Sequence, residues 1–277
     1  MLRVCGIVYG TLCAFLYFAQ TWLIFPGRDT QGAKSAEVAF QPDLERVDLT
    51  TADGDRVVAA FGAALTADGE ARADAATRPT VLYFYGNAMT LRDSLDRCDE
   101  FRRHGVNVMI PEYAGYGMSG GKAGEAGCYA TAEAAWRHLI GRKDVDPKRI
   151  VAAGWSLGAA VAIDLAARHG EVAGLATFSA FTSMTDMAAR EHWYVPVRLL
   201  LKHRFESERK LAGVTCPVFL AHGMEDELIP FAMMERLAQA AKGPVTRVPV
   251  AKGEHNDVFV VGGEALRKAF GEWVGAR

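Results

Sequence analysis

Short apolar runs alternate with helix-like stretches along most of this chain, and this alternation limits the folds open to it. The apolar runs occupy 46–49, 56–63, 81–85, 106–110, 150–154, 174–178, 218–222 and 246–250, and the helical patterns occupy 91–104, 129–140, 157–169, 231–241 and 264–274. Strands that alternate with helices of about a dozen residues indicate a parallel sheet covered by helices on both faces. The sequence therefore predicts an α/β fold. Its chemistry is expected in the loops beyond the carboxyl ends of the strands.

The composition excludes several classes of protein. With 277 residues, of which 50% are apolar and 23% are charged, the chain is too apolar to be disordered and long enough to bury a full core. Its net charge of −2 leaves no basic surplus to neutralise phosphates, so we expect no nucleic-acid partner. The cysteines form no Cys-x-x-Cys pair and the histidines show no metal-binding spacing. We therefore predict no disulfide framework, no metal site and no cofactor.

An uncharged segment at the N-terminus differs from the rest of the chain. No charged residue occurs between Arg3 and Arg28. This stretch is long enough to cross a hydrocarbon core of ~30 Å as a helix, and Trp22 near its far end suits the membrane interface. We therefore expect residues 1–28 to form a single-pass membrane anchor and residues 29–277 to form a globular domain.

Two other interpretations of this segment remain open. A cleaved signal peptide would need small residues before its cleavage site, where Leu16, Tyr17 and Phe18 stand instead. A buried helix of a soluble domain would rarely stay uncharged over so long a stretch. For the orientation, Arg3 favours an N-terminus on the inside and Arg28 opposes it, and we expect a domain that faces outward.

Residues 181–207 interrupt the alternation of strands and helices. They contain Met184, Met187, Trp193 and other apolar residues, but no clear strand pattern. Their position between two predicted strands suggests a small apolar cap over the functional site. A plain pair of surface helices would give the same pattern, so both interpretations remain open.

A candidate nucleophile lies between a predicted strand and a predicted helix. Gly154-Trp155-Ser156-Leu157-Gly158 follows the apolar run directly and begins the helical pattern. A strand, a sharp turn and a helix form the context of a nucleophile elbow, whose strained turn leaves no room for side chains beside the serine. Ser156 is therefore the predicted nucleophile.

Asp226 and His255 are the predicted partners of Ser156. A serine nucleophile needs a base, and the base needs a carboxylate that fixes its tautomer. Each of the two residues directly follows a predicted strand, in the chain order that this type of site requires. Glu225 and Asp257 are rival acids, but Asp257 is only two residues from the histidine and is more suited to capping the next segment.

Two backbone N–H groups are predicted to bind the negative charge that develops on an attacked carbonyl oxygen. One belongs to Leu157, directly after the nucleophile. The other belongs to Asn87 in the loop after strand 81–85, where Gly86 allows the backbone to approach a substrate.

The loop 115–120 reads GYGMSG and matches the dinucleotide fingerprint Gly-x-Gly-x-x-Gly. A functional fingerprint begins a helix, whereas the segment 121–124 that follows here reads GKAG and begins a helix poorly. We therefore expect this loop to flank the catalytic site and not to bind a dinucleotide.

These motifs together resemble the α/β-hydrolase superfamily. The matching segments are YGNA, EYAGYGMSGG, GWSLG, FTSMTDMA, CPVFLAHGMEDELIP and GEHND, which cover about residues 80–275, and the N-terminal LIFPG is similar as well. The nearest group is a membrane-anchored branch that resembles protein depalmitoylases and lysophospholipid lipases. The resemblance implies a mostly parallel eight-stranded sheet, a catalytic domain over 29–277 and a short cap over 181–207.

The resemblance also assigns roles by position. It implies Ser156 as nucleophile, Asp226 as acid, His255 as base, and Asn87 and Leu157 as oxyanion donors. One position departs from the family, because its loop usually reads His-Gly-Asn-Ala and Tyr85 replaces the histidine here. That histidine supports the loop and does no chemistry, so we expect activity to survive the replacement.

The sequence thus predicts a serine hydrolase that cleaves carboxylic esters or thioesters of acyl lipids or acylated proteins through an acyl-enzyme. An amidase or peptidase of the same fold is one alternative. A catalytically silent, membrane-anchored binding module is another, although such a protein would not need all three triad residues at strand ends.

Overall fold

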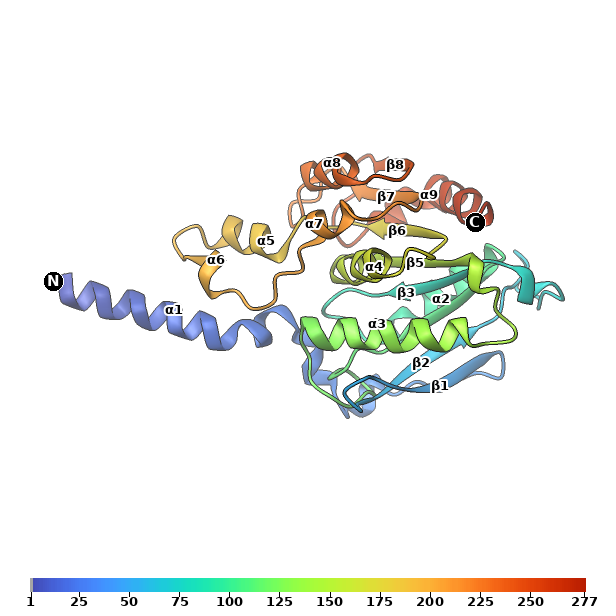
Figure 1. Cartoon of the computed structure of the whole chain (residues 1–277), viewed down its shortest axis with the longest axis horizontal. Helices are drawn as coiled ribbons and strands as arrows, with labels where there is room; N and C mark the ends of the chain where they lie inside the picture. The colour runs from blue at the N-terminus through green and yellow to red at the C-terminus, as the bar shows by residue number, and fades with distance from the viewer. Residues whose placement is uncertain (1) are drawn as a thin grey trace.

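Eight strands form one continuous sheet in the computed structural model, which describes residues 2–277 of the chain (Figure 1). The strands are β1 (Leu44–Thr50), β2 (Arg56–Gly62), β3 (Thr80–Phe84), β4 (Asn107–Pro111), β5 (Ile150–Trp155), β6 (Gly174–Phe178), β7 (Val218–Gly223) and β8 (Val245–Val250). Their spatial order is β1-β2-β4-β3-β5-β6-β7-β8, and β2 alone among these described strands runs antiparallel to its neighbours. The predicted, mostly parallel sheet is therefore confirmed.

Helices cover both faces of this sheet, as predicted. They are α2 (Leu95–Arg103), α3 (Glu125–Ile140), α4 (Leu157–Arg168), α7 (Ser207–Leu211), α8 (Phe231–Ala240) and α9 (Val258–Gly275). Helices α3, α4, α7 and α8 form one layer. On the other face, α2 and α9 meet through Phe101 and Phe270, whose ring centroids lie 4.8 Å apart. Because both faces are covered, β3 and β4 are buried along their whole length.

Helix boundaries differ from the prediction where local backbone geometry interrupts the apolar period. Helix α3 begins at Glu125, directly after the extended Gly124, and not at residue 129. Helix α9 begins at Val258 and contains a kink at Gly263, where φ is +49°. The kink explains why a continuous helical pattern is visible only from residue 264 onward.

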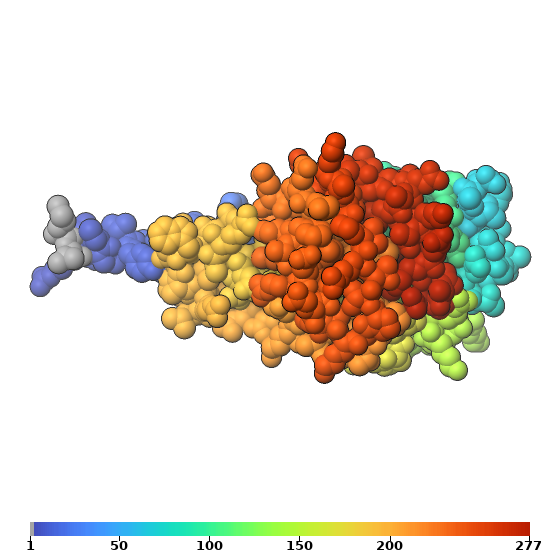
Figure 2. Space-filling view, turned by 90° about the horizontal axis from the view of Figure 1, so that it is seen from above, coloured from blue at the N-terminus to red at the C-terminus, as the bar shows by residue number. Residues whose placement is uncertain are grey.

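The N-terminal helix α1 (Leu2–Ile24) projects from the body of the molecule (Figures 1 and 2). Its segment Arg3–Ile24 is long and apolar enough to cross a membrane, and 6% of its most apolar 18-residue window is buried. The segment after it is packed on the domain, because Gly27 N–H donates to Asn87 O over 3.2 Å and Gly32 N–H to Gly117 O over 2.8 Å. The segment that follows α1 is therefore fixed to the domain, and the membrane anchor stays a prediction.

The insert 181–207 folds into two short helices, α5 (Met184–Glu191) and α6 (Val197–Leu200). Helix α6 lies alongside α1 and α5 packs on α6, beyond the end of the sheet where β5 leads into α4 (Figure 1). We call the segment 181–207 the cap. Its position gives it contact with the residues at the carboxyl ends of the strands.

Two glycines allow the turn between β5 and α4 to pack tightly. A Cβ atom on Gly154 would lie 2.1 Å from Gly158 O, and one on Gly158 would lie 2.0 Å from Phe84 O. Atoms other than hydrogen do not approach so closely without a bond. The first turn of α4 therefore rests directly on the backbone at the end of β3.

We predict that Gly158→Ala destabilises the protein by about 1–3 kcal/mol, because the added methyl group must push backbone atoms apart in a packed core. Gly170→Ala is the matched control, since a Cβ atom there would meet nothing within 4 Å. It should change the free energy of unfolding by less than about 0.5 kcal/mol. Urea unfolding of the full chain in detergent micelles measures both. Equal effects of the two substitutions would contradict the tight packing.

Candidate active site

Ser156 occupies a strained turn between β5 and α4. Its φ is +55° and its ψ −118°, a conformation that a residue with a side chain rarely adopts. The turn directs the serine away from the sheet and leaves Leu157 at the N-terminus of α4, where backbone N–H groups have no helical partner. This is the geometry predicted for a nucleophile elbow.

A chain of hydrogen bonds joins the three residues predicted as the triad. Ser156 Oγ lies 3.0 Å from His255 Nε2, and His255 Nδ1 lies 2.8 Å from Asp226 Oδ2. Since an ionised carboxylate only accepts hydrogen bonds, the proton of the neutral imidazole sits on Nδ1. Nε2 is then free to accept the serine proton, as general-base catalysis requires.

The carboxylate of Asp226 is held in its charged form. Burial by itself raises the pKa of Asp226, but hydrogen bonds from His222, His255 and Ile229 N–H outweigh it and hold the pKa well below its usual range. Ile229 N–H donates to Asp226 Oδ1 over 2.7 Å, and His222 Nε2 lies 3.3 Å from Asp226 Oδ2. The acid is therefore ionised at neutral pH.

The tryptophan of the elbow supports the histidine. The rings of Trp155 and His255 lie 5.3 Å apart with an angle of 30° between their planes. On its other side the Trp155 ring packs on Gly86, where a Cβ atom would lie 2.6 Å from the ring. Gly86 thus brings the loop after β3 close to the elbow.

Asn87 and Leu157, the predicted oxyanion donors, line the same cavity as Ser156. Neither backbone N–H donates to another backbone group of residues 2–277 outside the regular helices and strands. The Asn87 carbonyl accepts from Gly27 N–H and from the Tyr116 hydroxyl, which lies 2.9 Å away. The loop is thus fixed from behind, and the oxyanion role of these two residues stays a prediction.

Tyr85, which replaces the histidine usual in the family, supports this loop through a buried carboxylate. Its hydroxyl donates to Glu112 Oε1 over 2.7 Å and accepts from Tyr113 N–H over 3.1 Å. Glu112 also accepts from Leu91 N–H over 2.8 Å. Burial raises the pKa of Glu112, although these hydrogen bonds oppose the rise.

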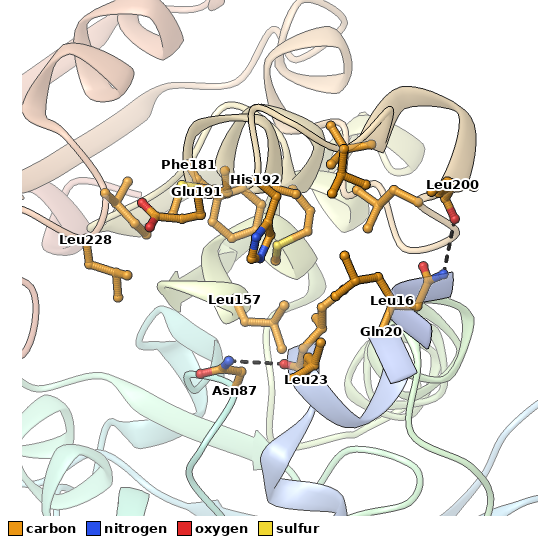
Figure 3. A pocket seen from close by; sticks show the side chains of 18 of the residues that line it. Leu16, Gln20, Leu23, Asn87, Leu157, Phe181, Glu191, His192, Leu200 and Leu228 are labelled. Carbon is orange, nitrogen blue, oxygen red and sulfur yellow. Dashed lines mark hydrogen bonds between the residues drawn. The ribbon is translucent and has the colours of Figure 1, made fainter. Parts of the chain in front are cut away.

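A cavity of about 350 Å³ lies beside Ser156 (Figure 3). Its walls come from α1, from the cap and from the loop after β7, and most of its side chains are apolar. The lining residues are Leu16, Gln20, Leu23, Ile24, Asn87, Ser156, Leu157, Phe181, Met184, Met187, Ala188, Glu191, His192, Val195, Val197, Leu200, Leu201, Leu228 and Ile229. The volume lies within the range typical of small-molecule sites.

The rival residues lie outside the hydrogen-bonded chain. Glu225 is exposed, and Asp257 accepts from Glu254 N–H within its own loop. The loop 115–120 does not begin a helix, since α3 starts at Glu125, and it therefore lacks the geometry of a dinucleotide fingerprint. Among residues 2–277, no group of three His, Cys, Asp or Glu side chains is arranged to hold a metal ion.

His222 is a site residue that the sequence analysis did not identify. Its fully buried ring contacts the Asp226 carboxylate and donates from Nε2 to Ile229 O over 2.7 Å. The spacing of four residues to Asp226 was the available signal. This spacing brings the two side chains into contact only because of the turn after β7, which no local pattern in the sequence reveals.

We predict that Asp226 makes stability depend on pH. Because its pKa is lower in the folded chain, its contribution is fully present above the unfolded value of about 4 and is lost as the pH falls toward the folded value. Urea unfolding of the full chain in detergent between pH 7 and pH 3 should show a smaller loss of stability for Asp226→Asn than for the wild type. The exposed Asp53→Asn is the control, and parallel curves for all three proteins would refute the prediction.

We also predict that Tyr85→Phe lowers the free energy of unfolding by about 1–3 kcal/mol, because it leaves the buried Tyr113 N–H without its acceptor. Tyr194→Phe removes a half-exposed hydroxyl and should cost less than about 0.5 kcal/mol. Thermal and urea unfolding of both variants test the difference. A cost no larger than that of the control would show that Tyr85 does not support the loop.

Comparisons with known proteins agree with this fold. The dienelactone hydrolase family matches residues 114–250. An uncharacterized protein of Mycobacterium tuberculosis is 36% identical over 191 residues, which cover 69% of this chain and 68% of that protein. Alpha/beta hydrolase domain-containing protein 17B of Homo sapiens is 32% identical over 188 residues, which cover 66% of this chain and 62% of that protein.

Solved structures show the same architecture at lower identity. An esterase of Pyrococcus furiosus matches with a TM-score of 0.65 and 19% identity over 85% of this chain and 90% of its own. An alpha-beta hydrolase of Vibrio vulnificus matches with a TM-score of 0.66 and 22% identity over 83% and 81% of the two chains. Together with the sheet order and the relatives in sequence, these matches show that the chain belongs to the α/β-hydrolase superfamily.

Proposed function

We propose that this hydrolase is a serine hydrolase that cleaves carboxylic esters or thioesters. The observation that carries the proposal is the continuous chain of hydrogen bonds from Ser156 through His255 to Asp226, which ends at a largely apolar cavity. Nucleophile, base and orienting acid are within hydrogen-bond reach of one another, as acyl transfer requires.

The reaction has two halves. Ser156 Oγ attacks the acyl carbon while His255 Nε2 takes the serine proton, and the oxyanion binds the N–H groups of Asn87 and Leu157. The bond from carbon to the leaving oxygen or sulfur breaks, and His255 gives its proton to that atom. Water then attacks the acyl-enzyme and passes a proton to His255. The bond from the acyl carbon to Ser156 Oγ breaks, His255 returns the proton to Oγ, and the carboxylic acid leaves.

The cavity supports a proposal for the substrate class. A mostly apolar lining next to the nucleophile suits the acyl chain of a lipid or of an acylated protein. The resemblance to depalmitoylases and lysophospholipid lipases supports the same class. We propose that residues 1–28 hold the catalytic domain 29–277 at a membrane, with the domain facing outward. The exposed apolar surface of α1 supports this location. A signal sequence would have the same apolar surface.

Labelling with a fluorophosphonate probe tests the nucleophile. We expect the wild-type chain to label and Ser156→Ala to lose labelling and ester hydrolysis, with a loss of at least about 10³-fold in kcat. Ser35→Ala, at an exposed serine far from the site in sequence, serves as the control and should label normally. A wild type that does not label would favour a silent binding module, and labelling of Ser156→Ala would refute the assignment.

A substrate competition separates the enzyme classes. We expect kcat/KM to rank an acyl thioester and a lysophospholipid above an aminoacyl amide in detergent micelles. The leaving groups of esters and thioesters need less assistance than an amine, and the apolar cavity favours the acyl part. A clear preference for the amide would overturn the proposal in favour of a peptidase.

A further inference from the structure

The apolar helix at the N-terminus forms one wall of the cavity beside Ser156. Leu16, Gln20, Leu23 and Ile24 of α1 line it, and the cap lies opposite them (Figure 3). We propose that α1 is part of the acyl-binding site, where its second half holds the acyl chain and limits the chain length that is accepted. This inference rests on the proposed function and names a specificity determinant of that same site.

Polar contacts seat the helix on the cap. Gln20 is 6% exposed, and its Nε2 donates to Leu200 O over 3.1 Å while its Oε1 accepts from Lys202 N–H over 2.6 Å. At the next residue, Thr21 Oγ1 lies 2.9 Å from His203 Nε2. A polar side chain in hydrocarbon is costly when it has no hydrogen-bond partner. The paired Gln20 therefore indicates that this side of α1 contacts protein and not lipid.

The helix has two different apolar faces. One face contributes Leu16 to the cavity, and the other carries Val8, Phe15, Phe18 and Trp22, whose exposed fractions are 63%, 59%, 78% and 55%. The spacing of the second set by three, four and seven residues follows the helical repeat. This second face is exposed along its length, whereas Gln20 on the cavity face is 6% exposed, so the two faces have different surroundings.

The end of the helix also holds the loop that is predicted to bind the oxyanion. Asn87 Nδ2 donates to Ile24 O over 3.1 Å, and Gly27 N–H donates to Asn87 O over 3.2 Å. Figure 3 shows Asn87 below the cavity, bonded to the last turn of α1. The same helix therefore contacts both the predicted acyl site and the residue beside the reacting carbonyl.

The part of α1 that lines the cavity has a length that suits an extended acyl chain. Leu16 and Ile24 are eight residues apart, which corresponds to about 12 Å along the helix axis. Figure 3 shows Leu157, which follows the nucleophile in the sequence, on one side of Leu16 and Leu200 on the other. A bulky side chain at position 16 would block the far part of the cavity and leave the part near the serine open.

Leu16→Trp in the full-length chain, measured in detergent micelles, tests the proposal. We expect kcat/KM for a p-nitrophenyl palmitate substrate to fall by roughly tenfold or more, a typical effect of steric exclusion in an apolar pocket, while p-nitrophenyl acetate changes by less than about twofold. Leu12→Trp is the matched control, because Leu12 is on the same helix, is 37% exposed and does not line the cavity. It should leave both rates unchanged.

A second variant keeps the test decisive if Leu16→Trp does not fold. Leu16→Ala enlarges the cavity and should shift the preference toward longer acyl chains, and fluorophosphonate labelling at the wild-type rate shows that each variant is folded. The inference is overturned if Leu16→Trp and Leu12→Trp have the same chain-length profile while acetate turnover persists. Failure of the proposed function is a different result, since the wild type would then cleave neither ester.

Discussion

The contact between the first turn of α4 and the end of β3 determines where the site lies. Gly158 rests on the Phe84 carbonyl with no space for a side chain, so α4 must begin directly beside the loop that follows β3. Ser156 is turned out of the sheet as a result, and Leu157 and Asn87 come to line the same cavity. The strained φ of the serine is the local cost of this packing, and the buried core on both faces of the sheet stabilises it.

The sequence predicts those parts of the fold and the site that depend on a pattern of neighbouring residues. The six inner strands are mostly buried and form continuous apolar runs, and the predicted ranges of all eight strands differ from the structure only by small shifts at their ends. The elbow is visible in the sequence because Gly154 and Gly158 flank Ser156. The meeting of Asp226 and His255 followed from the rule that carboxyl ends of parallel strands share one edge. By contrast, the partners of His222 and Tyr85 come together only through folded turns and loops, and no periodicity reveals them.

The role of α1 in the cavity was hidden for a physical reason. Lipid and an apolar cavity both require apolar side chains. An uncharged run in the sequence therefore does not show which of the two it contacts. Gln20 is a polar residue within this run that is buried and bonded to Leu200 and Lys202 of the cap. A membrane segment with such a residue is better read as one that has a protein partner.

The contacts of α1 with the cap extend farther along the helix than the cavity does. Tyr9 donates to the Tyr194 carbonyl, and from Tyr9 to Ile24 the helix rises about 22 Å, more than half of a ~30 Å hydrocarbon core. If α1 is immersed in a bilayer, as proposed, the cap tip with Trp193 and Leu199, each 82% exposed, would enter the bilayer with it. Under that proposal, an acyl chain would pass sideways from the bilayer into the cavity without contact with water, and such contact would cost about 0.8 kcal/mol for each methylene group.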